Sequence, residues 1–257
     1  MARAHNQALA AVLAAAFAGG MSGPARALDV GPKNLPLTVA GVAVQIPVAG
    51  SLDVHADDAA VMVEASATGD LVAIQDHALA IARGLRLARE PCAHKGLDVV
   101  VESIDAAKIT PVEATAVVDL SGHVAIWLCK KILGEMVKAE IASDSVGISV
   151  PVELFIPDPR SVALRLAGPA KLKTGDALTT EAASALVGDV DAALTAQLSR
   201  LLDATRARAA VPPLPGLDVT IERAAFAQDG AKLTVRASGR AAMTAAAFAR
   251  LLGYVGR

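Results

Sequence analysis

Apolar and polar residues alternate strictly along several segments of the chain. In residues 160–166 the apolar side chains of Val162, Leu164 and Leu166 stand at every second position. Such a period of two residues predicts a β-strand whose sheet has one apolar and one polar face. The same alternation predicts two antiparallel hairpins, built from residues 97–101 with 116–120 and from residues 217–221 with 233–237. The pattern therefore predicts one-sided antiparallel sheets.

Two other segments show apolar residues every three or four positions, which predicts amphipathic helices. Asp70 would cap the first helix, and its apolar stripe consists of Leu71, Ile74, Ala78, Ile81 and Leu85. The second helix would begin at Thr179 or Thr180, with a stripe of Val187, Val190, Leu194, Leu198 and Leu201. Pro91 and Pro212 follow the two segments, and proline cannot continue a helix. Each helix would cover the apolar face of a sheet.

Short motifs recur in one order along the chain, which indicates an internal repeat. The motif at 41–44 recurs at 147–150 and the motif at 68–70 recurs at 174–176, both at an offset of 106. The Gly-Leu-Asp-Val motif at 96–99 recurs at 216–219, and Ser121-Gly122 recurs as Ser238-Gly239. The fold class predicted from these patterns is α+β, with two tandem similar modules. Each module would be a one-sided antiparallel sheet packed on an amphipathic helix.

The predicted organisation has three parts. Residues 1–27 resemble a secretory signal peptide, with a weakly basic start, an apolar run and a small-x-small site at Ala25-Arg26-Ala27. Residues 28–130 would form the first sheet-helix-hairpin module and residues 131–257 the second. Cleavage near Ala27 would place the protein in the periplasm or outside the cell.

Composition narrows the classes of partner. The net charge is −2 and basic residues form no dense cluster, which argues against nucleic acid. Aromatic residues make up 2% of the chain, so the stacking platforms of carbohydrate and single-strand sites are scarce. Apolar residues make up 54% and are mostly aliphatic. They either fill an ordinary core or line an interior suited to acyl chains.

The hairpins resemble those of the tubular lipid-binding (TULIP) superfamily. The residues concerned are the Gly-Leu-Asp-Val starts, the Asp229-Gly230 turn, and the Ser-Gly exits at Ser121-Gly122 and Ser238-Gly239. The resemblance is to bacterial periplasmic members in which a long helix lies in a curved antiparallel sheet. It implies a tube of helix and sheet with an apolar interior that holds lipid.

A search for catalytic motifs favours a protein that is not an enzyme and needs no cofactor. The chain contains no Gly-x-Ser-x-Gly elbow, phosphate-binding glycine loop or His-Glu-x-x-His pair. Asp76 and His77 lie beside the apolar stripe of the first helix. The simpler interpretation is that they mark the boundary between its apolar and polar faces and do not form a catalytic base with its orienting carboxylate. A hydrolase that uses His77 would need a serine or cysteine within hydrogen-bond reach of the imidazole.

The two cysteines, Cys92 and Cys129, flank the first hairpin. Residues paired about a turn near 107–113 would bring them together at the open end of the hairpin. A disulfide is expected there in an oxidising compartment. The alternative is a metal site that also uses His94 and His123, although no established ligand spacing is present.

These observations predict an exported, non-enzymatic protein that binds an apolar ligand, most simply a lipid. The ligand would lie in a cavity between curved sheets and helices, lined by Leu71, Ile74, Ile81, Val162, Leu164, Leu166, Val187, Val190, Leu194 and Leu198. A membrane surface or an envelope protein is a further candidate partner. The alternative function is an envelope structural or protein-interaction module whose core is filled.

Overall fold

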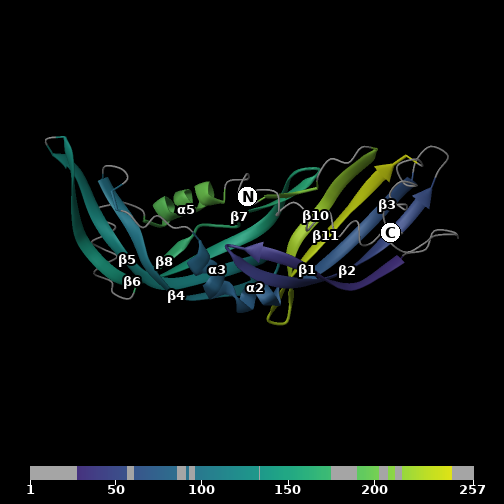
Figure 1. Cartoon of the computed structure of the whole chain (residues 1–257), viewed down its shortest axis with the longest axis horizontal. Coiled ribbons are helices and arrows are strands. Elements are labelled where there is room, and N and C mark those ends of the chain that lie inside the picture. Colours follow the sequence, from purple (N-terminus) through teal and green to yellow (C-terminus); the bar gives the residue numbers. More distant parts are fainter. Residues whose placement is uncertain are drawn as a thin grey trace.

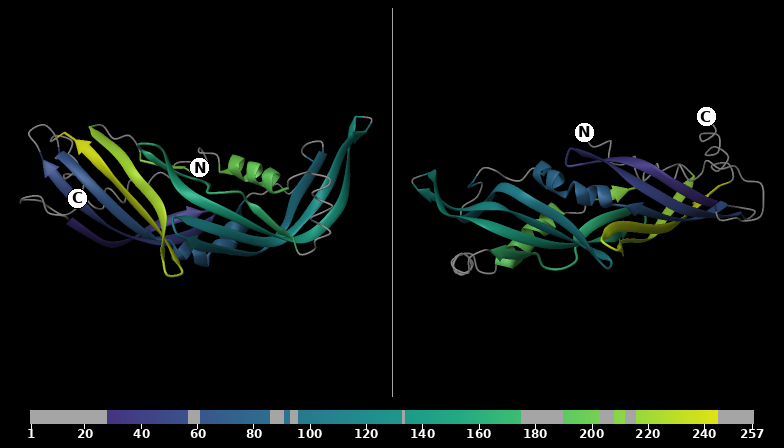
Figure 2. Two further views of the ribbon diagram at one scale, coloured as in Figure 1. Left: turned by 180° about the vertical axis from the view of Figure 1, so that it is seen from behind. Right: turned by 90° about the horizontal axis from the view of Figure 1, so that it is seen from below.

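The computed structural model describes residues 28–56, 61–85, 91–92, 96–132, 134–174, 190–202, 208–211 and 216–244. Strands dominate this part of the chain and form two curved antiparallel sheets that lie end to end (Figures 1 and 2). The first sheet has the strand order β1 (Leu28–Val39), β2 (Val42–Ala56), β3 (Val61–Asp70), β11 (Lys232–Met243) and β10 (Leu217–Asp229).

The second sheet is built on three long strands. Its order is β4 (Gly96–Val112), β5 (Thr115–Ile132), β6 (Glu135–Asp158), β7 (Ser161–Leu166) and β9 (Arg208–Ala210), while β8 (Lys171–Thr174) also pairs with β6. Valine, isoleucine and threonine are frequent in these strands, and their branched side chains suit a pleated, half-buried surface.

The predicted α+β class is wrong, because the described structure is mostly β. The helical segments α2 (Val72–Asp76) and α3 (Ala78–Gly84) are short, and α5 (Val190–Leu201) has twelve residues. The predicted first helix is interrupted at His77, whose backbone φ is −100°. Asp70 nevertheless accepts a hydrogen bond from the Val72 N–H at 2.8 Å, as expected of a residue at a helix start.

The segment from Lys130 to Val146, which the sequence predicts as the connection between the two modules, instead forms part of the β5–β6 hairpin. Strands from the two predicted modules share both sheets. The β10–β11 hairpin pairs with β3 of the first module, where Val235 lies opposite Gly69. The β4–β5 hairpin pairs with β6. Residues 1–27, the predicted signal peptide, lie outside the described residues.

The repeated Ser-Gly motif occupies equivalent places in the two hairpins. Gly122 lies opposite Ile104 and Gly239 lies opposite Ile221, each beside a β-bulge. A Cβ atom on Gly122 would overlap the carbonyl oxygen of Ser103, and one on Gly239 would overlap that of Thr220. Glycine therefore allows the neighbouring strand to approach closely where the sheet bends.

The protein has two buried clusters of apolar side chains. The first lies on the first sheet and contains Leu52, Val61, Val63, Val219, Ala241 and Met243, together with Val211 from the segment after β9. The second joins the sheets, because Phe226 and Leu233 of the first sheet pack with residues of the second. Its other buried members are Ala116, Val150, Val152 and Ala170. Burial at this junction holds the two sheets together.

The predicted disulfide between Cys92 and Cys129 is present, with a Cα–Cα distance of 5.3 Å. The hairpin turn lies further along than expected, since Val112 pairs with Thr115, and Cys129 lies directly opposite Gly96. Cys92 therefore reaches Cys129 from the segment before β4. Both cysteines are buried, so the bond anchors the free end of the β4–β5 hairpin. A disulfide is the chemistry expected of an exported protein.

Candidate functional site

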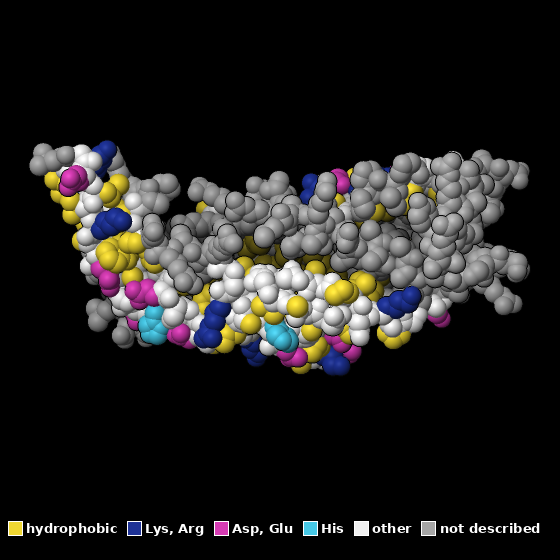
Figure 3. Space-filling model, viewed as in Figure 1, with side chains coloured by type: hydrophobic (Ala, Val, Ile, Leu, Met, Phe, Trp, Pro, Cys, Tyr) yellow, Lys and Arg dark blue, Asp and Glu magenta, His cyan; other side chains and the backbone are white. Residues whose placement is uncertain are grey.

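A band of half-buried aliphatic side chains lies where the second sheet meets the start of α2 and the C-terminal part of α5. They surround the buried cluster at the junction of the sheets and comprise Leu71, Ile109, Val118, Ile148, Leu154, Leu164, Leu166, Leu198 and Leu202. We call this set the aliphatic band. Figures 1 and 2 show α5 on the concave side of the curved sheet, and Figure 3 shows apolar side chains deep in the central hollow of one face.

The structure brings four of the predicted ligand-binding residues together in this band. Leu71 precedes α2, Leu164 and Leu166 lie on β7, and Leu198 lies on α5. These residues come from both halves of the chain and meet because the two sheets share the second buried cluster.

The remaining predicted lining residues either do not belong to the band or have side chains outside the described part of the chain. Ile74, Ile81 and Val162 are half-buried but do not belong to the cluster. Val187 lies outside the described residues, as do the side chains of Val190 and Leu194.

Strand β7 differs from the prediction in which of its faces is more buried. Ser161 and Ala163 are 0% and 1% exposed, whereas Val162, Leu164 and Leu166 are half-buried. The Ser161 hydroxyl donates a hydrogen bond of 2.7 Å to Asp158 Oδ2, which satisfies it in the interior. Ser161 and Ala163 are thus more covered than the aliphatic residues of β7, although Arg165 on the same face is exposed. The larger aliphatic side chains keep accessible surface on the concave side.

Polar side chains that the sequence analysis did not identify hold the helices against the sheets. On α5, Thr195 Oγ1 accepts a hydrogen bond from the Ala170 N–H at 3.0 Å, and Asp191 Oδ1 accepts one from the Leu172 N–H at 2.9 Å. These bonds fix α5 over β8 and set the position of Leu198.

Gln75 on α2 has a comparable role at the junction of the sheets. Its Nε2 donates to the Ile109 carbonyl at 3.0 Å and to the Ala231 carbonyl at 3.2 Å. Its Oε1 accepts from the Leu233 N–H at 2.8 Å. Because Ile109 lies on β4 and Leu233 on β11, one side chain connects both sheets.

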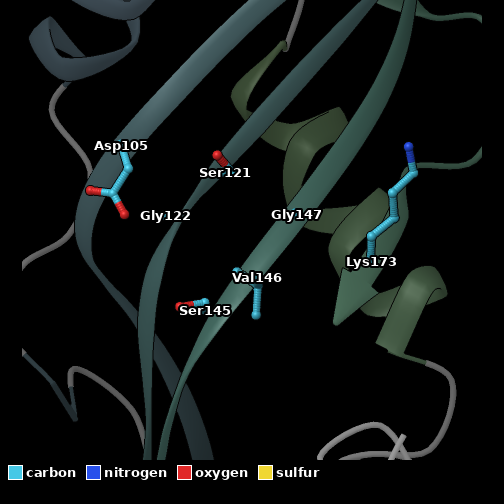
Figure 4. Close-up of a pocket in the computed structure, with 7 residues that line it drawn as sticks. All are labelled: Asp105, Ser121, Gly122, Ser145, Val146, Gly147 and Lys173. Carbon is cyan, nitrogen blue, oxygen red and sulfur yellow. The ribbon is translucent and has the colours of Figure 1, made fainter. Parts of the chain in front are cut away.

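An open pocket of about 510 Å³ lies on the opposite face of the second sheet (Figure 4). Its lining residues are Asp105, Ser121, Gly122, Ser145, Val146, Gly147 and Lys173. Beside it, His123 Nδ1 lies 2.9 Å from Asp105 Oδ2, and the Ser145 hydroxyl lies 3.0 Å from His123 Nε2. The Ser103 hydroxyl donates to Asp105 Oδ1 at 2.9 Å. A β-bulge at Asp105 turns its carboxylate toward His123.

This order of atoms is that of a Ser-His-Asp triad, in which the carboxylate orients an imidazole that takes the serine proton. Two features favour a structural role instead. His123 and Ser145 are directly paired in the β5–β6 ladder, where backbone N–H groups bond to neighbouring strands and not to a substrate oxyanion. The side chains of His123 and Asp105 are also 52% and 51% exposed, whereas transition-state stabilisation is strongest where water is excluded.

The second hairpin contains an equivalent ion pair. At the same offset as the Ser-Gly repeat, 117 residues, Glu222 replaces Asp105 and Arg240 replaces His123. Arg240 Nε lies 3.3 Å from Glu222 Oε1, across the bulge of β10. An arginine cannot act as a general base. The feature shared by both hairpins is therefore an ion pair that fixes a bulge opposite a glycine.

The electrostatics of Asp105 fit this role. The hydrogen bond from Ser103, together with the hydrogen bond and charge of His123, holds the pKa of Asp105 below its usual value. The carboxylate is thus ionised near neutral pH and available to fix His123.

The other sites considered from the sequence have little structural support. His77 Nδ1 lies 2.8 Å from the Ala73 carbonyl oxygen, an arrangement local to the α2–α3 break. The disulfide removes both cysteines as metal ligands. Within the described residues, no group of three or more His, Cys, Asp or Glu is arranged to hold a metal ion. No helix in that part of the chain is long and apolar enough to cross a membrane.

Comparison of the chain with models of protein families, with curated proteins and with solved structures found no match.

Proposed function

We propose that this protein is an exported, non-enzymatic binder of an apolar ligand, with an acyl chain of a lipid as the preferred class. The ligand would lie along the aliphatic band, on the concave side of the second sheet. The observation that carries the proposal is the incomplete burial of this band: nine aliphatic side chains surround a buried cluster without being buried themselves.

The energetics favour such a ligand. Covering apolar surface contributes about 25 cal/mol per Å², so an acyl chain that buries several of these side chains gains several kcal/mol. The nine side chains of the band are all aliphatic. A ligand bound there would therefore be selected by its hydrocarbon part, and its polar head would have to remain at the edge of the band.

The proposal is tested with the fluorescent polyene fatty acid cis-parinaric acid as a probe. We expect saturable binding to the mature, disulfide-bonded protein and displacement by unlabelled fatty acid. Leu164→Trp should weaken binding at least tenfold because the indole occupies space on the concave face. Leu198→Asn should weaken binding because it places an amide in the band.

Leu85→Asn is the matched control, since Leu85 is 49% exposed and lies outside the band. Circular dichroism and the melting temperature establish that each variant is folded. Equal probe binding by folded Leu164→Trp, Leu198→Asn and Leu85→Asn proteins would refute the aliphatic band as the site. No saturable binding to the unaltered protein would favour a structural or interaction module with a filled core.

A further inference from the structure

The tip of the β5–β6 hairpin carries exposed aliphatic side chains. Leu128, Ile132 and Val137 are 43%, 46% and 45% exposed. β4 begins opposite Cys129, so beyond that residue the hairpin has no β4 neighbour. Figures 1 and 2 show the ends of β5 and β6 curving away from the other described strands. We call residues 128–132 and 134–138 the hairpin tip.

The register of the hairpin places these three side chains on one face. Leu128 lies opposite Ala139, Lys130 opposite Val137 and Ile132 opposite Glu135. Residues at every second position of β5 share a face, so Leu128 and Ile132 continue the side that carries Val118 of the aliphatic band. The apolar side of β5 thus runs from the junction of the sheets to the exposed tip. On β6, the same face of the hairpin includes a charged residue, Asp144, so its apolar surface is not continuous.

Lysines accompany the aliphatic residues. Lys130, Lys131 and Lys138 are all exposed, and none of them takes part in an ion pair among the described residues. Lys130 lies on the aliphatic face, whereas Lys131 and Lys138 lie on the opposite face. The tip also carries one acidic residue, Glu135, which lies opposite Ile132, so the three lysines outnumber it. Figure 3 shows hydrophobic, basic and acidic side chains together at this end of the molecule.

Exposed aliphatic residues among lysines are suited to the boundary of a membrane. The aliphatic groups would enter the acyl region, and the ammonium groups would remain at the level of the phosphates at the ends of their apolar stems. The disulfide at Cys129 anchors the base of the hairpin, which limits the freedom of a ribbon that would otherwise be only marginally stable.

We propose that the hairpin tip docks the protein onto an anionic lipid surface. Negative lipid head groups complement the three lysines, which gives this occupant preference over an apolar protein partner. Docking does not depend on the proposed ligand site, because it needs only the surface of the tip. If both hold, the shared apolar side of β5 connects the membrane with the aliphatic band.

The test measures sedimentation of the mature, disulfide-bonded protein with vesicles. One set contains phosphatidylglycerol and phosphatidylethanolamine, and the other contains only phosphatidylcholine. We expect binding to the anionic vesicles that weakens as salt is raised. Lys130→Gln/Lys131→Gln/Lys138→Gln should lower the partition coefficient on the order of 100-fold, since each of the three lysines contributes about fivefold near an anionic surface.

The matched charge control is Lys108→Gln/Lys171→Gln/Lys232→Gln, which removes three exposed lysines elsewhere and should change binding less than twofold. For the aliphatic part, Leu128→Ser/Val137→Ser should lower binding about tenfold. Leu85→Ser/Val112→Ser is its control, because these residues are 49% and 46% exposed.

Equal effects of the tip and control variants, or equal binding to both kinds of vesicle, would overturn the proposal. A dimer in sedimentation velocity that Leu128→Ser/Val137→Ser converts to a monomer, without vesicle binding, would assign the tip to self-association instead. Cis-parinaric acid binding measured in the same tip variants separates the two proposals. If only the docking proposal is wrong, probe binding by the tip variants should be unchanged. If the ligand-site proposal is wrong, probe binding should already be absent in the unaltered protein.

Discussion

Loss of the disulfide should destabilise the protein in a way that can be calculated from chain topology. Cys92 and Cys129 are 37 residues apart, and the bond restricts the unfolded chain over that length. In the chain-entropy model a loop of this size contributes about 4 kcal/mol at 25 °C. For a chain of this length each kcal/mol corresponds to roughly 2–4 °C, so we expect the melting temperature to fall by about 10 °C.

The measurement is urea unfolding of three forms: the oxidised protein, the same protein under reducing conditions, and Cys92→Ala/Cys129→Ala. Alanine is preferred to serine because Cys92 and Cys129 are 8% and 2% exposed, and a buried hydroxyl would add its own cost. The reduced protein and the alanine variant should lose similar free energies of unfolding. A loss below about 1 kcal/mol in both would contradict the assignment of the bond as the anchor of the hairpin.

Four further outcomes follow from the described contacts. Gly122→Ala should cost about 1–3 kcal/mol of unfolding free energy because its Cβ would overlap a strand carbonyl, whereas Gly31→Ala has no atom within 4 Å and should be nearly neutral in the same urea titration. Gln75→Ala should cost about 2 kcal/mol through the loss of hydrogen bonds to both sheets, measured by thermal unfolding, and an unchanged melting temperature would refute that role. The pKa of Asp105 is lower in the folded than in the unfolded protein, so its ionised carboxylate should stabilise the fold above about pH 4. This contribution should be lost as the pH falls through the folded-state pKa. Asp105→Asn should remove that part of the pH dependence of the melting temperature. A fluorophosphonate probe should leave Ser145 unmodified, and labelling that depends on the His123 imidazole would instead establish a catalytic triad.

The local features of the fold could be predicted from the sequence. Alternation located strands of the β4–β5 and β10–β11 hairpins but not the β5–β6 hairpin, Asp229-Gly230 located the β10–β11 turn, and the cysteine spacing gave the disulfide. Each of these depends on residues close to one another along the chain or paired across one turn. For this reason periodicity and turn chemistry were sufficient.

The long-range features could not be predicted in this way. The helical periodicity of residues 71–85 gives no sign of the break at His77. It also gives no sign of which strands pair with the strands beside it. The exchange of hairpins between the two sheets depends on contacts such as that between Gly69 and Val235, which no local pattern encodes. An alternating segment can pair with any strand of suitable length, and burial of the whole sheet selects the partner.

For the candidate sites too, the sequence predicts some of the residues and misses the contacts that depend on the fold. Leu71, Leu164, Leu166 and Leu198 were predicted as apolar lining residues, and the structure brings them into one band. The pairing of Asp105 with His123 was missed because a bulge shifts the side-chain alternation. The repeat did contain a signal, since Glu222 and Arg240 stand at the same offset as the Ser-Gly motif.

The proposed ligand site is tested most directly by native mass spectrometry of the disulfide-bonded protein, purified from an expressing cell without added lipid. We expect a stoichiometric adduct of lipid mass that organic extraction recovers and that Leu164→Trp removes from the folded protein. The Leu85→Asn protein should retain the adduct. Unliganded protein, together with no uptake of fatty acid on titration, would contradict the proposal that the concave aliphatic band binds an apolar ligand.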